Sequence, residues 1–416
     1  MTKRKRLILV ETEMKSPKGH FLDCLIETTK LFEKKFELSW FINKKFYSNG
    51  AYIPKKVKIY KIINGNYFER KKNKFLYILN LILNLLINIL QIFFFTLYFL
   101  YYGKLFTFFK VLVINHFIIP KYFYSFYWSY KKQNLTSNDH IFFQSARRND
   151  LSLINFIIKL DINHPKFHIR VFLPPKKRFR GFFYFLNKLS KQLISGKVFV
   201  YLFGKNTFNY FLQNCSTKKN ICISNLPWTF YNRKNKQKDY TIGFLGNARQ
   251  SRGFEILPNI IESIENKSKK FNFLIHFSDI ENELKSVKNK LYNLAKTNKR
   301  IKIIEEYSDY YRFRKILQKI DIMPIIHNSS ELNKITSGTM YSCITHQIPI
   351  VIPKGTNFKK ELLKHKSYEK ANNIDEFTDK LIKISNNYKL YLNNAKKNSN
   401  ILKLKLHNDP LIKNIC

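Results

Sequence analysis

The sequence predicts an α/β fold made of two parallel-sheet domains, and three observations carry this prediction. Short apolar runs alternate with amphipathic helical patterns along most of the chain, as in folds whose strands are joined by crossover helices. A polar run at 231–239 separates two such series and is typical of a linker. With 416 residues, the chain is also too long for one ordinary core. We therefore expect an N-terminal domain over 1–232, a C-terminal domain over 240–385 and a helical tail over 386–416.

The N-terminal series opens with a strand, a glycine-bearing turn and a helix. The run RLILVE begins at Arg6, the turn that follows contains Pro17 and Gly19, and a helical pattern runs from Phe21 to Phe32. Further strands are predicted at 38–43, 57–64, 139–145, 167–173, 197–203 and 221–224.

The C-terminal series repeats this architecture without repeating the sequence. Strands are predicted at 240–246, 271–277, 301–304, 320–326 and 348–353, and helices at 254–264, at 310–318 and from near Ser337. Both domains are thus expected to be Rossmann-like and to face a cleft, because open parallel sheets bind ligands beyond the carboxyl ends of their strands.

Charge and cysteine content narrow the functional class. The chain carries 74 Lys+Arg against 28 Asp+Glu, a net charge of +46, but the lysines are spread over its whole length. This favours an anionic membrane surface as partner over nucleic acid, for which no recognised motif is present. Five cysteines without a CxxC pair favour unpaired thiols in a reducing cytosol, and the first apolar run is too short for a signal peptide.

The first phosphate-compatible loop follows the strand at 240–246. Gly246 ends the strand, and Arg249 and Arg252 lie in the turn before the next helix. Backbone amides and guanidinium groups in this position suit a diphosphate. A capped helix with solvated arginines would explain this loop equally well.

The second loop precedes the strand at 348–353. It places Ser337, Gly338 and Thr339 where a helix should start, with Lys334 upstream. Small residues at a helix N-terminus leave free amides open to an anion. Ordinary N-capping is the alternative, but two such loops in one domain favour a diphosphate site.

These loops resemble the donor half of the GT-B nucleotide-sugar glycosyltransferases, a large class that includes bacterial lipopolysaccharide and polysaccharide enzymes. The resemblance rests on TIGFLGNARQSRGF, KIDIMPII and SGTMYSCITHQIPIVIP, in the order of the family. The N-terminal domain is similar more faintly, through RLILVETEMKSPKGHFLDCLIETTKLF and NICISNLPW.

The resemblance implies roles for particular residues. Residues 246–252 and 337–339 would contact the donor diphosphate, and Gly19 with His20 would lie near the acceptor. The sequence departs from the family pattern at one pair of positions. Many retaining members carry two glutamates eight residues apart, and here those positions hold Lys334 and Ser342. The ribose contact and the stereochemistry are therefore left open, and a non-catalytic, membrane-associated scaffold with a degenerate fold is an alternative.

Candidates for acid–base chemistry and for metal binding are few. His20 and Glu13, with Glu11 as a rival carboxylate, lie near the end of the first strand and could deprotonate an acceptor hydroxyl. A structural histidine and solvated carboxylates are the alternatives. No DxD pair is found in a suitable loop, so we expect no metal site and no cofactor besides the nucleotide-sugar co-substrate.

An uncharged stretch from 75 to 103 interrupts the N-terminal domain. It exceeds the ~20 apolar residues that span a bilayer, but both flanks are basic and Asn80, Asn84 and Asn88 form a polar seam. These features favour an insertion at about 75–130 that dips into one leaflet; a buried core helix and a true span are alternatives. The membrane contacts expected from this insertion are Phe93, Phe94, Phe95 and Trp128.

Together these features predict a glycosyltransferase that moves a hexosyl or related group from a nucleotide sugar to a membrane-linked saccharide or lipid. The expected pathway is lipopolysaccharide, polysaccharide or glycolipid biosynthesis. The expected location is the cytoplasmic face of the inner (plasma) membrane, as a peripheral or monotopic protein. A basic nucleic-acid-binding protein is the less favoured alternative.

Overall fold

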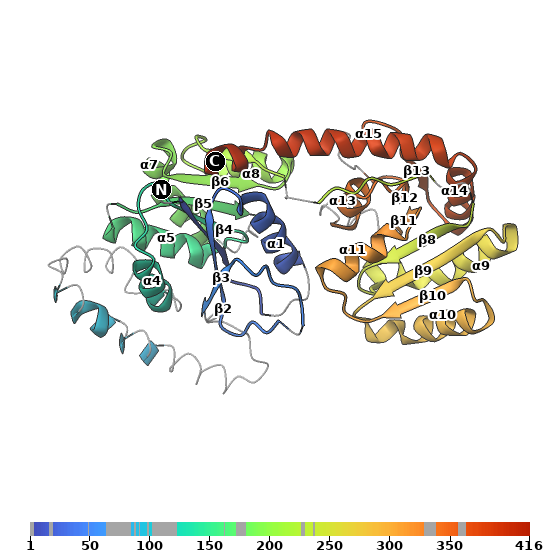
Figure 1. Cartoon of the computed structure of the whole chain (residues 1–416), viewed down its shortest axis with the longest axis horizontal. Helices are drawn as coiled ribbons and strands as arrows, with labels where there is room; N and C mark the ends of the chain where they lie inside the picture. Colours follow the sequence, from blue (N-terminus) through green and yellow to red (C-terminus); the bar gives the residue numbers. More distant parts are fainter. Residues whose placement is uncertain are drawn as a thin grey trace. The chain divides into compact units, whose positions relative to one another are not determined.

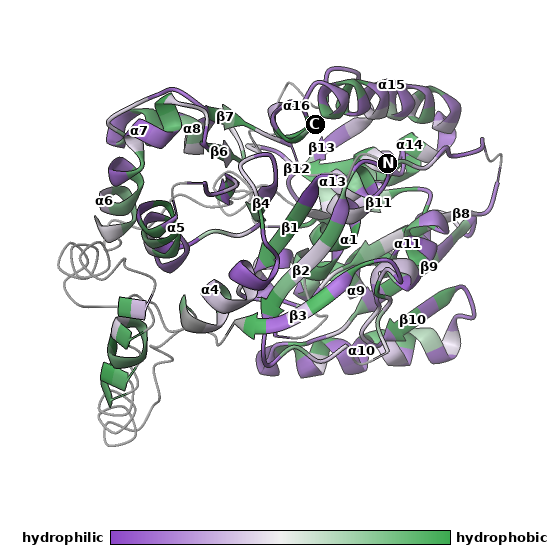
Figure 2. Ribbon diagram, turned by 60° about the vertical axis from the view of Figure 1, so that its left-hand side comes forward, coloured by the Kyte–Doolittle hydropathy of each residue, from purple (hydrophilic) through white to green (hydrophobic). Residues whose placement is uncertain are grey.

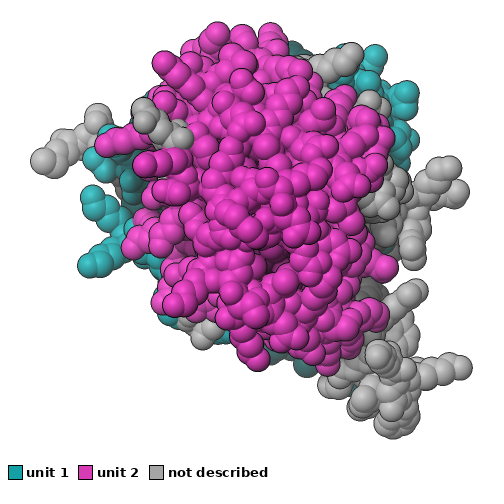
Figure 3. All heavy atoms as spheres, turned by 90° about the vertical axis from the view of Figure 1, so that its right-hand side faces the viewer, with its two compact units in different colours: residues 1–227, 408–416 teal, residues 228–407 magenta. Residues whose placement is uncertain are grey.

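The computed structural model divides the chain into two compact units (Figure 3). Unit 1 comprises residues 1–227 and 408–416, and unit 2 comprises residues 228–407. The structure describes residues 4–15, 20–48, 50–63, 85–86, 89–90, 92–97, 100–101, 123–161, 163–171, 180–225, 229–235, 238–327, 338–356 and 363–416.

Unit 1 is built on a seven-stranded sheet in the order β3-β2-β1-β4-β5-β6-β7 (Figure 1). Every neighbouring pair is parallel. The strands are β1 (Arg6–Glu11), β2 (Glu37–Asn43), β3 (Lys58–Ile63), β4 (His140–Phe143), β5 (Lys166–Val171), β6 (Val198–Leu202) and β7 (Ile221–Ile223). The helices are α1 (His20–Phe32), α4 (Phe123–Lys132), α5 (Arg148–Leu160), α6 (Arg180–Lys188), α7 (Ser190–Ile194), α8 (Lys205–Asn214) and α16 (Pro410–Ile415).

The two faces of this sheet differ in composition. Side chains alternate across a strand, and Ile8 and Val10 of β1 join one large apolar core with helices α4, α5 and α6. The other face also buries polar side chains: His140 Nδ1 lies 2.9 Å from His168 Nε2, and His168 Nδ1 lies 2.9 Å from the Tyr201 hydroxyl.

Unit 2 contains two three-stranded parallel sheets, β10-β9-β8 and β11-β12-β13. A parallel bridge between Ile242 and Ile322 joins β8 to the start of the β11 segment. The strands are β8 (Tyr240–Leu245), β9 (Phe271–Phe277), β10 (Ile301–Glu305), β11 (Met323–Pro324), β12 (Ile350–Pro353) and β13 (Tyr368–Ala371). The α-helices are α9 (Leu257–Lys267), α10 (Lys285–Thr297), α11 (Tyr310–Gln318), α13 (Gly338–Thr345), α14 (Ile374–Asn386) and α15 (Tyr388–His407), and three short 3₁₀ turns are η1 (Gln250–Arg252), η2 (Phe254–Ile256) and η3 (Asn282–Leu284).

The pattern of burial follows the periodicities of the sequence. β8 and β9 are almost wholly buried, as expected for parallel strands covered on both faces. Helix α10 instead alternates hydrophilic and hydrophobic residues along its length (Figure 2), and Leu291 is its one fully buried residue. The predicted α/β class with parallel sheets is confirmed.

Candidate functional site

The loop after β8, residues 246–253, contains three of the residues predicted for the site, and we call it the donor loop after its predicted role. Gly246 has φ +133°, a conformation that L side chains rarely adopt. A Cβ at this position would overlap Nη1 of Arg252, so the guanidinium folds back over the glycine. Glycine at 246 therefore makes the space that Arg252 occupies.

A second glycine fixes the donor loop against the β11 segment. Gly253 has φ +70°, and a Cβ there would overlap the carbonyl oxygen of Ile326. The close backbone contact brings the carboxyl ends of β8 and β11 together, which is the edge of a parallel sheet where ligands bind.

Electrostatics in the donor loop favour an anion. Burial lowers the pKa of the half-buried Arg252, and the nearby charge of Arg249 lowers it further. His327 follows Ile326, and burial together with Arg252 lowers the pKa of its imidazole to about 4, so the ring is neutral at pH 7. Neither arginine forms an ion pair with a carboxylate of the described residues, although Glu281 Oε2 accepts a hydrogen bond from the backbone N–H of Gln250 in the same loop at 2.8 Å. Two guanidinium groups that are not ion-paired there are suited to phosphate oxygens.

Helix α13 provides the second predicted loop in part. Gly338 begins the helix, is exposed, and has open space where a Cβ would lie. Thr339 follows it and is half-buried. Lys334 and Ser337 lie outside the described residues, so their diphosphate contacts stay predictions.

In unit 1, the predicted acid–base residues lie at the end of β1. Glu13 forms an ion pair with Arg147, with Nη2 and Oε2 3.1 Å apart. His20 begins α1, but its side chain and the whole of Gly19 lie outside the described residues. The catalytic roles of Glu13 and His20 and the acceptor-side role of Gly19 thus stay predictions.

Glu11, the rival carboxylate, is fully buried. Its Oε2 accepts a hydrogen bond from the Ser145 hydroxyl at 2.7 Å, and its Oε1 accepts one from the backbone N–H of Glu13 at 3.1 Å. Burial raises its pKa to about 8 despite these bonds, so this carboxyl is mostly protonated at pH 7.

The four residues predicted to contact the membrane differ in how exposed their side chains are. Phe93 and Phe94 are 57% and 56% exposed, and Trp128 of α4 is half-buried. Phe95 corrects the prediction, because it is 1% exposed and packs against Phe123 and Tyr127 in the core of unit 1. A side chain in that position does not reach a lipid surface.

The described part of the chain lacks two features. None of its helices is both long enough and apolar enough to cross a membrane. It also contains no group of three or more His, Cys, Asp or Glu side chains placed to hold a metal ion.

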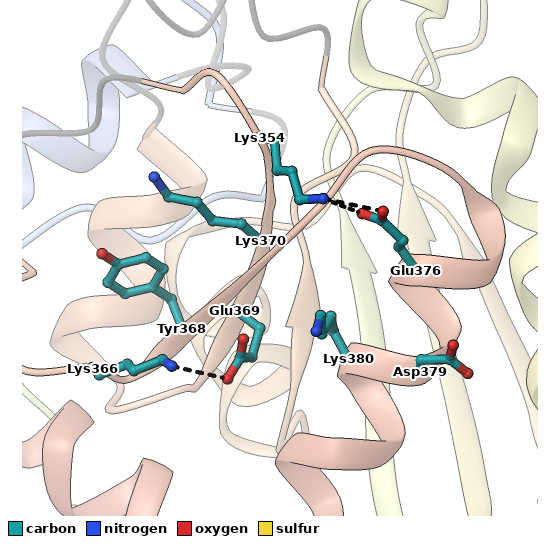
Figure 4. A pocket seen from close by; sticks show the side chains of 8 residues that line it. All are labelled: Lys354, Lys366, Tyr368, Glu369, Lys370, Glu376, Asp379 and Lys380. Carbon is teal, nitrogen blue, oxygen red and sulfur yellow. Dashed lines mark hydrogen bonds and ion pairs between the residues drawn. The ribbon is translucent and has the colours of Figure 1, made fainter.

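A separate hollow of about 370 Å³ lies in unit 2 beside β13 and α14 (Figure 4). Four lysines and three carboxylates line it, and two of the lysines are paired there: Lys354 with Glu376 at 3.1 Å and Lys366 with Glu369 at 3.6 Å. It contains none of the residues predicted for the site. The balance of charge makes it a poorer anion receptor than the donor loop.

Sequence reasoning singled out Gly246, Arg249 and Arg252, whose diphosphate contacts stay predictions, and it did not point to His327, which the structure places beside Arg252. The position of His327 in the sequence could have pointed to it, because it directly follows an apolar strand whose carboxyl end faces the donor loop. The contact with Arg252 depends on the packing of β8 beside β11, which no local pattern specifies.

Comparison with solved structures identifies the fold. A glycosyltransferase from Rickettsia africae aligns with 99% of this chain and 96% of its own length, with 13% identity and a TM-score of 0.55. Anabaena HepE, solved with UDP and glucose, aligns with 99% of this chain and 97% of its own, with 12% identity and a TM-score of 0.52. The chain has the GT-B fold.

Other comparisons are more limited. The match to TarM of S. aureus covers 67% of this chain but 54% of TarM, with 13% identity and a TM-score of 0.46. No protein-family model and no curated protein sequence matches the chain. Among the described residues, the donor loop and the N-terminus of α13 carry the groups for which anion binding was predicted.

Proposed function

We propose that this protein is a glycosyltransferase that moves a hexosyl or related sugar from a nucleotide-sugar donor to a saccharide or lipid acceptor. One observation carries the proposal: Arg252 folds over Gly246 beside a neutral His327, with no carboxylate partner among the described residues. The GT-B fold supports it, and the HepE structure with UDP and glucose is consistent with a donor of this class.

The reaction breaks the bond between the sugar and the nucleotide's phosphate and forms a bond from the sugar to an acceptor hydroxyl, whose proton would pass to a base such as His20 or Glu13. Negative charge grows on the leaving phosphate oxygens. Fixed positive groups placed at those oxygens stabilise the transition state more than the ground state. Arg252 and Arg249 would supply this charge from one side, and the N-terminus of α13 would supply its dipole. Because these groups would provide the stabilisation without a metal ion, we propose metal-independent transfer.

The test is release of nucleotide from UDP-, GDP-, dTDP- and CMP-sugars, with and without EDTA. We expect turnover with one donor, unaffected by EDTA, and about a hundredfold lower kcat for Arg252→Ala, the size of effect seen when one stabilising donor is removed. Arg312→Ala is the matched control, because this arginine is 65% exposed and lies on α11. Turnover abolished by EDTA and restored by Mn²⁺ would refute metal independence, and no release from any donor would favour a scaffold.

We also propose that the acceptor is membrane-linked and that the protein works at the cytoplasmic face of the inner membrane, in lipopolysaccharide, polysaccharide or glycolipid synthesis. Support comes from the exposed apolar side chains of unit 1. Of the twelve described residues between 85 and 101, nine carry large apolar side chains that are 49% to 84% exposed. Exposed apolar surface of this extent marks an interaction site, and the net charge of +46 favours an anionic membrane.

Vesicle sedimentation tests this placement. We expect binding to vesicles containing phosphatidylglycerol and about tenfold weaker binding for the double variant Phe93→Ser/Phe94→Ser, since burying apolar area drives insertion. Leu390→Ser is the control, because Leu390 is 60% exposed but lies on α15 of unit 2. A native protein that does not sediment with these vesicles would contradict the proposal.

A further inference from the structure

Three polar side chains lie next to one another across the sheet of unit 1. The register pairs Val10 with Phe143 and Phe143 with Ile169. The next residue of each strand therefore brings Glu11, Gln144 and Arg170 into one row on the opposite face, because side chains alternate. The row lies at the carboxyl ends of β1, β4 and β5, the edge at which parallel sheets bind ligands.

Two members of this row are buried without hydrogen-bond partners among the residues that the structure describes. Arg170 is 2% exposed, and none of its three guanidinium nitrogens has a hydrogen-bond partner in the described part of the chain. Gln144 is 0% exposed, and neither its amide nitrogen nor its amide oxygen has one. Arg170 does stack over the ring of Phe142, at 4.8 Å from the ring centroid, but this contact satisfies no N–H group. Folded proteins rarely leave such groups unsatisfied, above all a buried charge.

The carboxyl groups nearby do not fill this role. Glu11 already accepts hydrogen bonds from Ser145 and from a backbone N–H, and its raised pKa of about 8 leaves it mostly uncharged at pH 7. Asp409 attracts Arg170 electrostatically but makes no hydrogen bond to it. The oxygens of Asp409 accept instead from Ser224, Asn225 and Leu411.

We propose that Arg170 and Gln144 bind an oxyanion, a phosphate or carboxylate group, and that this group is part of the acceptor; the second half rests on the proposed sugar transfer. A guanidinium offers a planar fork of N–H donors, and an amide NH₂ beside it adds another donor. Since these side chains are at most 2% exposed, the site takes the anionic group alone and not a sugar ring.

Thermal shift at constant ionic strength tests the site, with inorganic phosphate, methyl phosphate and acetate as probes. We expect the melting temperature of the native protein to rise with probe concentration and to saturate. Arg170→Met should lose the response, whereas Arg312→Met should keep it, because that arginine is 65% exposed. Arg252→Ala should also keep it, which separates this site from the donor loop. A response lost in Arg252→Ala but kept in Arg170→Met would overturn the proposal.

Two further readouts keep the test decisive. In buffer without the probes, Arg170→Met should melt at or above the native protein, because it removes a buried charge without partners. If that variant does not fold, Gln144→Leu decides, and we expect at least tenfold weaker apparent affinity for the probe. An unchanged affinity in Gln144→Leu, or no saturable response in the native protein, would show that water satisfies these groups and would overturn the proposal.

The three probes separate the sources of the anion. A response to methyl phosphate supports a phosphate monoester on the acceptor, and a response to acetate supports a sugar acid. A response to inorganic phosphate alone overturns the link to the acceptor. Because the probes need no donor, failure of the proposed sugar transfer would leave the response of Arg170 intact.

Discussion

Glu11 is the residue whose charge depends most directly on the fold. Its carboxyl is 1% exposed, and burial raises its pKa from 4.5 to about 8. The folded protein therefore holds a proton that the unfolded chain releases between these two values. The contribution of this proton to the free energy of unfolding is fully present below pH 4.5 and is lost as the pH rises through 8.

We predict that the free energy of unfolding of the native protein falls between pH 5 and pH 8 relative to Glu11→Gln, which has no titratable carboxyl. The expected difference is on the order of 3 kcal/mol, because each pKa unit corresponds to about 1.4 kcal/mol. Urea unfolding at pH 5, 6, 7 and 8 measures it. Parallel pH curves for the two proteins would show that Glu11 is charged in the folded state.

The sequence could indicate some residues of the candidate site and not others. Gly246 and Arg252 follow an apolar strand in an obvious turn, and the need for glycine is a local backbone property. The unpartnered state of Arg170 is different, since it depends on which side chains of α1, β6 and the C-terminal segment surround it. A lone arginine in an apolar strand signals only that its environment is unusual.

At the scale of elements, strands and helices with strong periodicity were predictable. The apolar run of β9 and the helical pattern of α11 were predicted at 271–277 and 310–318, the bounds that the structure shows. The predicted strand at 320–326 pairs regularly only at Met323–Pro324, and Pro324 has no N–H to donate. Strand β13 was not predicted, because Tyr368–Ala371 is short and carries two charged residues.

The three consecutive phenylalanines, Phe93, Phe94 and Phe95, show what amino-acid composition does not predict, namely which side chains are buried. Successive helical residues point about 100° apart, so the three cannot share one environment. The structure buries Phe95 and exposes the other two. Composition alone could not assign which of them faces the core.

We predict that Phe95→Ala lowers the free energy of unfolding by about 3 kcal/mol or more, because it leaves a cavity among Phe123 and Tyr127. Phe94→Ala is the matched control, and we expect a change within about 0.5 kcal/mol because its side chain is exposed. Equilibrium denaturation of both variants decides between these outcomes. Equal effects would mean that Phe95 is not part of the core.

At the scale of the whole molecule, the C-terminal residues pack with the first unit of the chain and not with the residues that directly precede them. Residues 408–416 belong to unit 1 although the preceding 180 residues form unit 2. Asp409 fixes this segment by accepting a hydrogen bond from Ser224 at 2.7 Å, across a separation of 185 residues. No local pattern can encode such a contact, whereas the α/β class is repeated in every strand–helix unit.

The proposed sugar transfer requires that a nucleotide bind at the donor loop. Thermal shift of the native protein with UDP, GDP, dTDP and CMP tests this binding when it is repeated for Arg252→Ala, Gly246→Ala and the control Arg312→Ala. A nucleotide that binds only the folded state adds about 2.7 kcal/mol at a hundredfold excess over its Kd. A Cβ at residue 246 would displace the guanidinium of Arg252, so both donor-loop variants should respond alike.

We expect one nucleotide to raise the melting temperature of the native protein and of Arg312→Ala, and to have little effect on Arg252→Ala and Gly246→Ala. That result would establish the donor site and name the base of the donor. No shift with any nucleotide, or an equal shift in all four proteins, would contradict a nucleotide-sugar site at the donor loop.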